Sequence, residues 1–160
     1  MATVTTNGNK YKNKYAIANT LDYYTDTSNP GTNWIYWTAC GVDCNDIETA
    51  KNQMMRSMSN KVSYSDTKMH QVFVKISWDE MKNMNVNSGI EAEEILVGFI
   101  GRYFYSYGLQ SISFVYRNRT GIFIRTIVNS ISLRNGKAIN RFTPFLKELE
   151  DKLNDFIYND

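Results

Sequence analysis

The chain has 160 residues, a length typical of one domain, and its contents of 42% apolar and 21% charged residues are ordinary for a globular protein. No apolar run approaches the roughly 20 residues that a helix needs to cross a bilayer, and the N-terminal segment has no apolar signal-peptide core. We therefore expect a cytoplasmic protein without a membrane partner. Two cysteines exclude a disulfide-rich scaffold, and the net charge of +2 by itself favours no class of partner.

The first half of the chain is expected to alternate between helix and strand. Polar composition predicts a mobile start over residues 1–14. Apolar side chains at helical spacing predict a short helix over 15–24, and aromatic and β-branched residues predict a strand over 34–39. Asn45 or Asp46 can cap a second helix that runs to about residue 59.

The second half adds further periodic segments. They predict strands at 69–78, 111–116 and 122–131, and helices at 88–107 and 143–156. A capping box opens the first of these helices at Ser88, and Gly108 is its expected stop. The four residues from Arg117 to Thr120 make a hairpin turn between the last two strands. The predicted fold is a single α+β domain over residues 1–160, a mostly antiparallel sheet covered by helices.

Common catalytic and metal-binding motifs are missing from the sequence. The spacing of Cys40 and Cys44 does not fit a zinc knuckle, and no second cysteine pair exists. No phosphate-binding glycine loop, dinucleotide fingerprint or serine-nucleophile motif is present, so no cofactor is expected. His70 is the single histidine, and a structural role at the start of a strand is favoured over a catalytic one.

The charged residues are distributed very unevenly. No aspartate or glutamate occurs between Ile95 and Lys147, while the rest of the chain is acidic on balance. The basic residues of this window are Arg102, Arg117, Arg119, Arg125, Arg134, Lys137, Arg141 and Lys147. Because aromatic residues interleave with these cations, the window favours a polyanion that also offers bases to stack on. The alternative is that the cations are scattered over the surface and solvated.

Four segments in fixed order, covering about residues 18–156, carry a resemblance to a known family. They are 20–24 followed by Asn29-Pro30, 40–44 before Glu48-Thr49-Ala50, the strand at 69–77, and the hairpin at 113–131 followed by Gly136-Lys137. Together they resemble the N-terminal domain of the relaxase/mobilization nuclease family of bacterial plasmids, which implies a related, ferredoxin-like sandwich fold. Those relaxases usually continue well beyond this domain.

The resemblance also implies a site. Family members attack a DNA phosphodiester with a tyrosine, which by position is Tyr23 here, and three histidines hold a divalent metal that polarises the phosphate. The positions of those histidines are occupied by Tyr116, Phe123 and Arg125. None of the three histidines remains, so the resemblance implies a protein that binds DNA without metal-dependent nicking. Arg125 could then contact a phosphate, or it could pair with a carboxylate such as Asp22.

Three functions remain open at this point. The first is a catalytically degenerate relaxase-like protein that binds DNA, most simply single-stranded, during plasmid or mobile-element mobilisation (conjugation). Its expected phosphate contacts are Arg117, Arg119, Arg125, Arg134, Lys137 and Arg141. The second is an active nickase that uses Tyr23, with His70 as a weaker catalytic candidate. The third is an accessory module that binds a true relaxase or another mobilisation protein.

Overall fold

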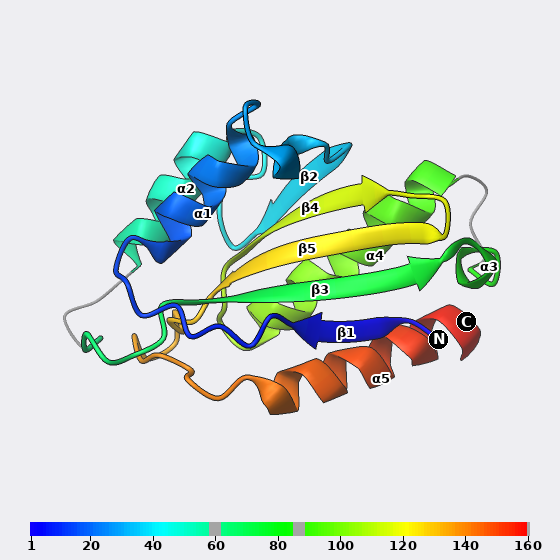
Figure 1. The fold of residues 1–160 in the computed structure, drawn as a ribbon. Coiled ribbons are helices and arrows are strands. Elements are labelled where there is room, and N and C mark those ends of the chain that lie inside the picture. The colour runs from blue at the N-terminus through cyan, green and yellow to red at the C-terminus, as the bar shows by residue number, and fades with distance from the viewer. Residues whose placement is uncertain (58–61, 85–88, 160) are drawn as a thin grey trace.

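The computed structural model describes residues 1–57, 62–84 and 89–159 and has an α+β fold in which helices pack on an antiparallel sheet (Figure 1). The elements in chain order are β1 (Thr3–Thr6), α1 (Ala16–Thr25), a short 3₁₀ helix η1 (Pro30–Thr32), β2 (Tyr36–Cys40), α2 (Ile47–Arg56), β3 (Met69–Ser77), α3 (Trp78–Met81), α4 (Gly89–Ser106), β4 (Ser111–Arg117), β5 (Gly121–Asn129) and α5 (Thr143–Asn159). The predicted class, helices on a mostly antiparallel sheet, is confirmed.

The five strands follow the order β1-β3-β5-β4-β2, and every neighbouring pair is antiparallel. The central strand β5 pairs with β3 from Met69 opposite Asn129 to Ser77 opposite Gly121. The predicted hairpin joins β4 to β5 through residues 118–120, where the Asn118 side chain accepts hydrogen bonds from the backbone N–H groups of Thr120 and Gly121. Long pairing on both sides makes β5 the most constrained strand of the sheet.

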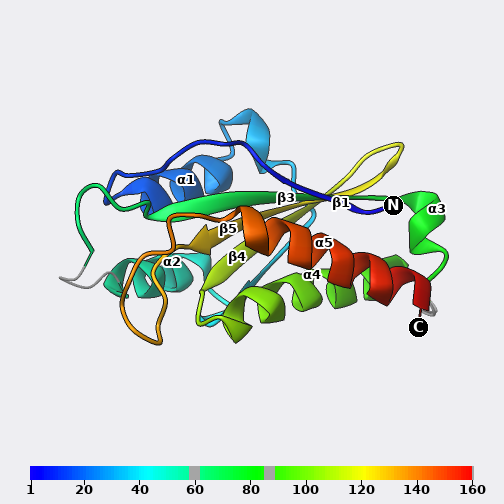
Figure 2. The same cartoon turned by 90° about the horizontal axis from the view of Figure 1, so that it is seen from below.

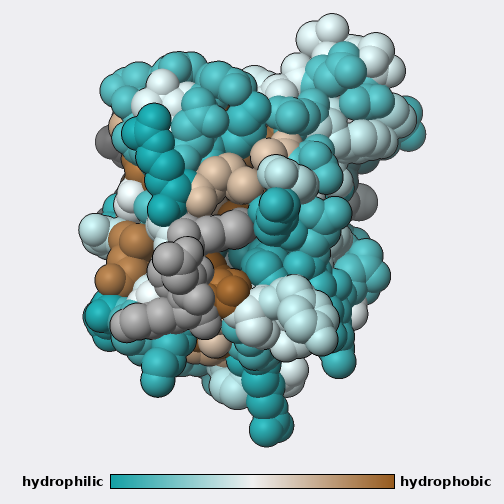
Figure 3. Space-filling view, turned by 90° about the vertical axis from the view of Figure 1, so that its left-hand side faces the viewer, coloured by the Kyte–Doolittle hydropathy of each residue, from teal (hydrophilic) through white to brown (hydrophobic). Residues whose placement is uncertain are grey.

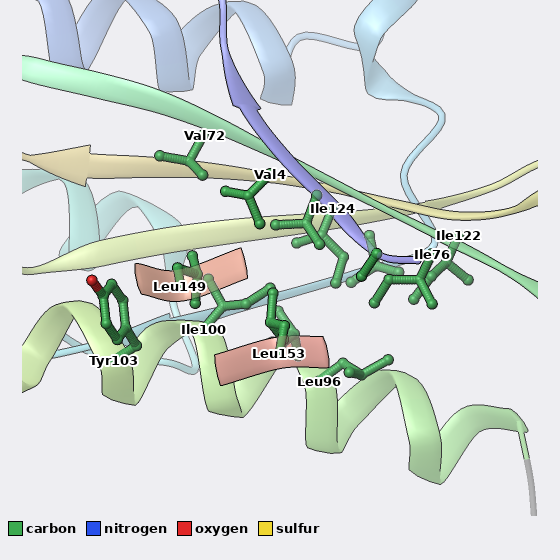
Figure 4. Packing of buried hydrophobic residues seen from close by; sticks show 14 of the residues in the cluster. Val4, Val72, Ile76, Leu96, Ile100, Tyr103, Ile122, Ile124, Leu149 and Leu153 are labelled. Carbon is green, nitrogen blue, oxygen red and sulfur yellow. The ribbon is translucent and has the colours of Figure 1, made fainter. Parts of the chain in front are cut away.

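The two long helices α4 and α5 pack on one face of the sheet (Figure 2). Figure 4 shows Val4 of β1, Val72 of β3 and Ile124 of β5 on the side of the sheet that faces Ile100 of α4 and Leu153 of α5. The alternation along β3 is as expected, since Val72, Val74 and Ile76 are buried toward these helices while Lys75 is exposed on the other side. This layer holds the larger of two hydrophobic clusters.

The other face of the sheet is covered at one end only, by α1 and α2. Ile17 and Leu21 of α1 and Met54 of α2 pack there with Ile112 and Ile127 of the sheet. The Asp46 side chain accepts from the Glu48 N–H and so caps α2, which agrees with the prediction. The remaining part of this face, toward the β4–β5 hairpin, carries the candidate site described below.

The sequence prediction missed two four-residue elements, β1 and α3. Residues 1–14 were predicted to be mobile, but β1 pairs with β3, and Val4 of β1 and the preceding Ala2 are buried. The strand predicted over 69–78 ends at Ser77, whose side chain accepts from the Glu80 N–H in a capping box that opens α3. Four-residue elements contain too few positions for periodicity to show.

Helix α4 ends as the sequence predicts. Gly108 has φ +77°, a left-handed conformation that glycine adopts without a steric cost, and its N–H donates to the Tyr105 carbonyl. The capping box expected at Ser88 lies outside the described residues. The helix predicted to run to about residue 59 is α2, which ends at Arg56 with Ser57 as its C-cap. Within the described ranges, no helix is long and apolar enough to cross a bilayer.

Candidate nucleic-acid interface

The part of the sheet that α1 and α2 leave uncovered presents a group of aromatic and basic side chains. We call it the open face and define it by Phe73 and Lys75 of β3, Tyr116 of β4, and Phe123 and Arg125 of β5. Strand alternation puts these five residues on the same side of the sheet. Lys75 is exposed and the other four are half-buried, so each can still be reached by a ligand.

The aromatic rings of the open face lie in contact across neighbouring strands. Phe73 stacks on Phe123 with ring centroids 5.7 Å apart and planes 17° from parallel. Tyr116 is the register partner of Phe123, and their centroids are 5.9 Å apart at 56°. The sequence expectation that Tyr116, Phe123 and Arg125 lie together is therefore confirmed, and the aromatic rings form one continuous surface.

Arg125 lies at the centre of this group. Its guanidinium carbon is 4.2 Å from the ring centroid of Tyr24 and 5.1 Å from that of Phe73. Its Nη1 donates to the Tyr24 hydroxyl and, at 3.3 Å, to the Gln71 side-chain oxygen. Its Nε is buried without a hydrogen-bond partner in the part of the chain that the structure describes.

No carboxylate among the described residues neutralises Arg125. The pairing with Asp22 that the sequence left open is not found, because the Asp22 carboxylate accepts from Lys51 Nζ at 2.9 Å instead. Aromatic faces attract the cation but do not cancel its charge. Tyr116 is a further hydrogen-bond partner of Arg125, and the buried Nε is out of reach of a ligand. A guanidinium whose charge no carboxylate cancels is nevertheless suited to attract a phosphate.

Two adjacent tyrosines of α1 border the open face. Tyr23 is 43% exposed, and its ring meets that of Tyr24 edge-on, with centroids 5.1 Å apart. Both line a cavity of about 240 Å³ together with Asn19, Thr20 and Gln71. Burial raises the pKa of Tyr24 although nearby Arg125 acts in the opposite direction, so this hydroxyl stays protonated at neutral pH.

The contact of Tyr24 with Arg125 was not found from the sequence. The resemblance singled out Tyr23, and consecutive residues on a helix point in directions about 100° apart. Helical spacing shows that one member of the pair faces inward. It does not show that this member meets a strand roughly a hundred residues later in the chain.

His70 lies on the opposite face of the sheet from Arg125. Its ring stacks on Phe142 with centroids 4.0 Å apart, and its Nε2 is 2.8 Å from the Ile139 carbonyl oxygen. The side chain is buried, and this burial lowers its pKa below the ordinary value. These contacts match the structural interpretation of His70 and put it outside the candidate site.

The other basic residues proposed from the sequence do not gather on the open face. Arg117 forms a two-pronged ion pair with Glu93, at 2.7 and 2.9 Å, and Arg119 is exposed on the hairpin loop. Arg134 donates to the Ser106 carbonyl at the end of α4. Lys137 and Arg141 follow in the segment between β5 and α5, which extends on the α4–α5 side of the sheet (Figure 2).

The described residues contain no group of three histidine, cysteine or acidic side chains that could hold a metal ion. Cys40 and Cys44 are both free thiols, and burial raises the pKa of the Cys40 thiol. Comparisons of the chain with protein-family models, with curated proteins and with solved structures found no match. The arguments about function therefore depend on the residues and on their geometry.

Proposed function

We propose that the protein binds single-stranded DNA on the open face, as a relaxase-like domain that holds DNA during plasmid or mobile-element mobilisation without metal-dependent nicking. The observation that carries this proposal is the unneutralised Arg125 among half-buried aromatic rings. The relaxase-like character of the fold is part of the same proposal and depends on the four sequence segments that resemble that family.

The chemistry of the open face favours a single strand over a duplex. Aromatic rings bind bases by stacking, which contributes about 1–3 kcal/mol per base, and bases inside a duplex are not accessible to them. Phe123 and Phe73 offer ring faces from adjacent strands, with Lys75 Nζ 5.9 Å from the Phe123 ring centroid. Arg125 would bind the phosphate that links two stacked nucleotides.

The test is fluorescence anisotropy with a labelled 30-nucleotide single strand and the matching duplex, at low and moderate salt. We expect the wild type to prefer the single strand, and both Arg125→Gln and Phe123→Ala to weaken binding by tenfold or more. Arg119→Gln, an exposed arginine on the hairpin loop, is the matched control and should change affinity less than threefold. Equal losses in the control and the site variants would contradict a localised site.

Failure of the wild type to bind either strand at low salt would refute the proposal. In that case the accessory-module hypothesis would take its place, and a stable complex with a relaxase would be the next observation to seek.

A second function, an active tyrosine nickase, is favoured by the cavity beside α1. Tyr23 is exposed on this cavity, close to the Tyr24–Arg125 contact. This hypothesis predicts a covalent adduct between protein and a labelled oligonucleotide that survives denaturing electrophoresis. Tyr23→Phe should abolish the adduct while Tyr24→Phe retains it. Absence of any adduct with the wild type, with and without a divalent metal, would exclude this function.

A further inference from the structure

The segment between β1 and α1 is fixed in position by hydrogen bonds to the start of β3. Tyr11 forms an isolated antiparallel bridge with Met69, and its carbonyl accepts from the Lys68 N–H at 2.6 Å. Two residues later, Asn13 accepts from the backbone of both Tyr15 and Ala16. The polar segment therefore has a defined course across the molecule.

Three lysines alternate with these anchoring residues. Lys10, Lys12 and Lys14 are all exposed, and none forms an ion pair with a residue that the structure describes. Lys51, by contrast, is held by two carboxylates. The backbone bends at Asn13 and turns at Lys14 into α1, so the three ammonium groups follow this curved segment as a short row of positive charge.

This row lies next to the open face. The Tyr11 hydroxyl accepts from the Gln71 amide at 2.9 Å, and the Gln71 oxygen accepts from Arg125 at 3.3 Å, so two hydrogen bonds separate the segment from the central guanidinium. The segment runs along β3 on the α1 side of the sheet (Figures 1 and 2). Figure 3 looks onto the end of the molecule that this segment borders, where hydrophilic residues surround smaller apolar patches.

We infer that Lys10, Lys12 and Lys14 form a phosphate-binding track that leads a single strand onto the open face. This inference rests on the proposed function and adds the path of the DNA. The single-stranded DNA would pass from the track over Gln71 to Arg125 and the aromatic rings. Lysine ammonium groups contact phosphates as point charges without reading bases. The track therefore contributes affinity and salt dependence, while the rings of the open face contribute the preference for unpaired bases.

The experiment compares two triple variants that remove the same charge. In the first, K10Q, K12Q and K14Q are combined; in the second, R134Q, K137Q and R141Q neutralise three cations on the α4–α5 side. Anisotropy with the labelled 30-nucleotide strand is measured at several salt concentrations, and thermal unfolding checks that each variant is folded. Each phosphate contact contributes about 0.7 to the slope of log affinity against log salt for a single strand, so three contacts contribute about 2.

We expect the lysine variant to lose about 2 from that slope and on the order of tenfold in affinity at low salt, with the second variant near wild type. A lysine variant that binds like wild type, while Arg125→Gln is defective, would overturn the track and leave the proposed function intact. A wild type that binds no strand would overturn both. Displacement of the strand by polyglutamate at equal charge would show that the segment attracts any polyanion and would overturn the assignment to nucleic acid.

Discussion

Replacing Arg117 by methionine should destabilise the fold and leave binding of single strands unchanged. The Glu93 carboxylate is nearly inaccessible, with 4% of its side chain exposed, and it receives both prongs of the Arg117 guanidinium at 2.7 and 2.9 Å. Methionine keeps much of the aliphatic contact but leaves the buried carboxylate without the two donors. The cost of the substitution is therefore the desolvation of an unpaired charge.

Two typical values bound the stability that Arg117→Met should lose. Breaking a fully buried ion pair costs about 3–5 kcal/mol, whereas hydrogen bonds to charged groups contribute about 1.5–3 kcal/mol. Arg117 is 42% exposed, so solvent already screens its half of the pair and the lower range applies. We expect a loss of about 2 kcal/mol, which for a domain of this size lowers the melting temperature by roughly 4–8 °C.

Thermal and urea unfolding of Arg117→Met, Arg119→Gln and the double variant Arg117→Met/Glu93→Leu provide the assay. The exposed Arg119→Gln control should stay within about 0.5 kcal/mol of wild type. The double variant should recover most of the loss, because no charge is left buried. A normal melting temperature for Arg117→Met combined with weakened binding of DNA would refute this reasoning. It would indicate instead that Arg117 contacts a phosphate of the DNA.

Three further changes should affect stability in distinct ways. Gly121→Ala should lower the free energy of unfolding by about 3 kcal/mol, because a Cβ there would meet the Ile76 carbonyl oxygen and lie 2.7 Å from the Ser77 Cα. An unchanged midpoint of urea unfolding would contradict this close approach of β3 and β5. Leu153→Ala should leave a cavity between α5 and the sheet and lower the free energy of unfolding by about 2–5 kcal/mol. A loss below about 1 kcal/mol would mean that the side chains around this position repack. Because burial lowers the pKa of His70, the unfolded chain takes up the proton first as pH falls below about 6.5. Stability should thus decline from pH 7.5 to 5.5, and His70→Phe should reduce that decline in unfolding midpoints.

Much of the secondary structure follows from local sequence. The alternation along β3, the hairpin between β4 and β5 and the glycine stop after α4 all depend on residues close together in the chain. The same holds for the Asp46 cap of α2. The strand β1 was not predicted because it is stabilised by pairing with β3, about seventy residues away. The local composition of residues 1–14 does not indicate that pairing.

The candidate site was predicted in part. Strand alternation and hairpin register correctly put Tyr116, Phe123 and Arg125 together. The charge asymmetry of the second half predicted a basic surface that the structure divides between opposite sides of the sheet, because a segment that passes from β5 to α5 changes layer. The contact of Arg125 with Tyr24 brings together distant parts of the chain, and no local pattern indicates it.

The sequence by itself determined the fold class, the positions of most helices and strands, and the two faces of β3 and of the β4–β5 hairpin, since these depend on periodicity and turn chemistry over a few residues. The tertiary structure alone decided which half of the sheet α1 and α2 leave open. It also decided that Arg125 has aromatic neighbours in place of a carboxylate, and that the segment before α1 is connected to it through Tyr11 and Gln71. Those facts depend on how elements far apart in the chain pack, and packing selects one arrangement from many that the same local patterns allow.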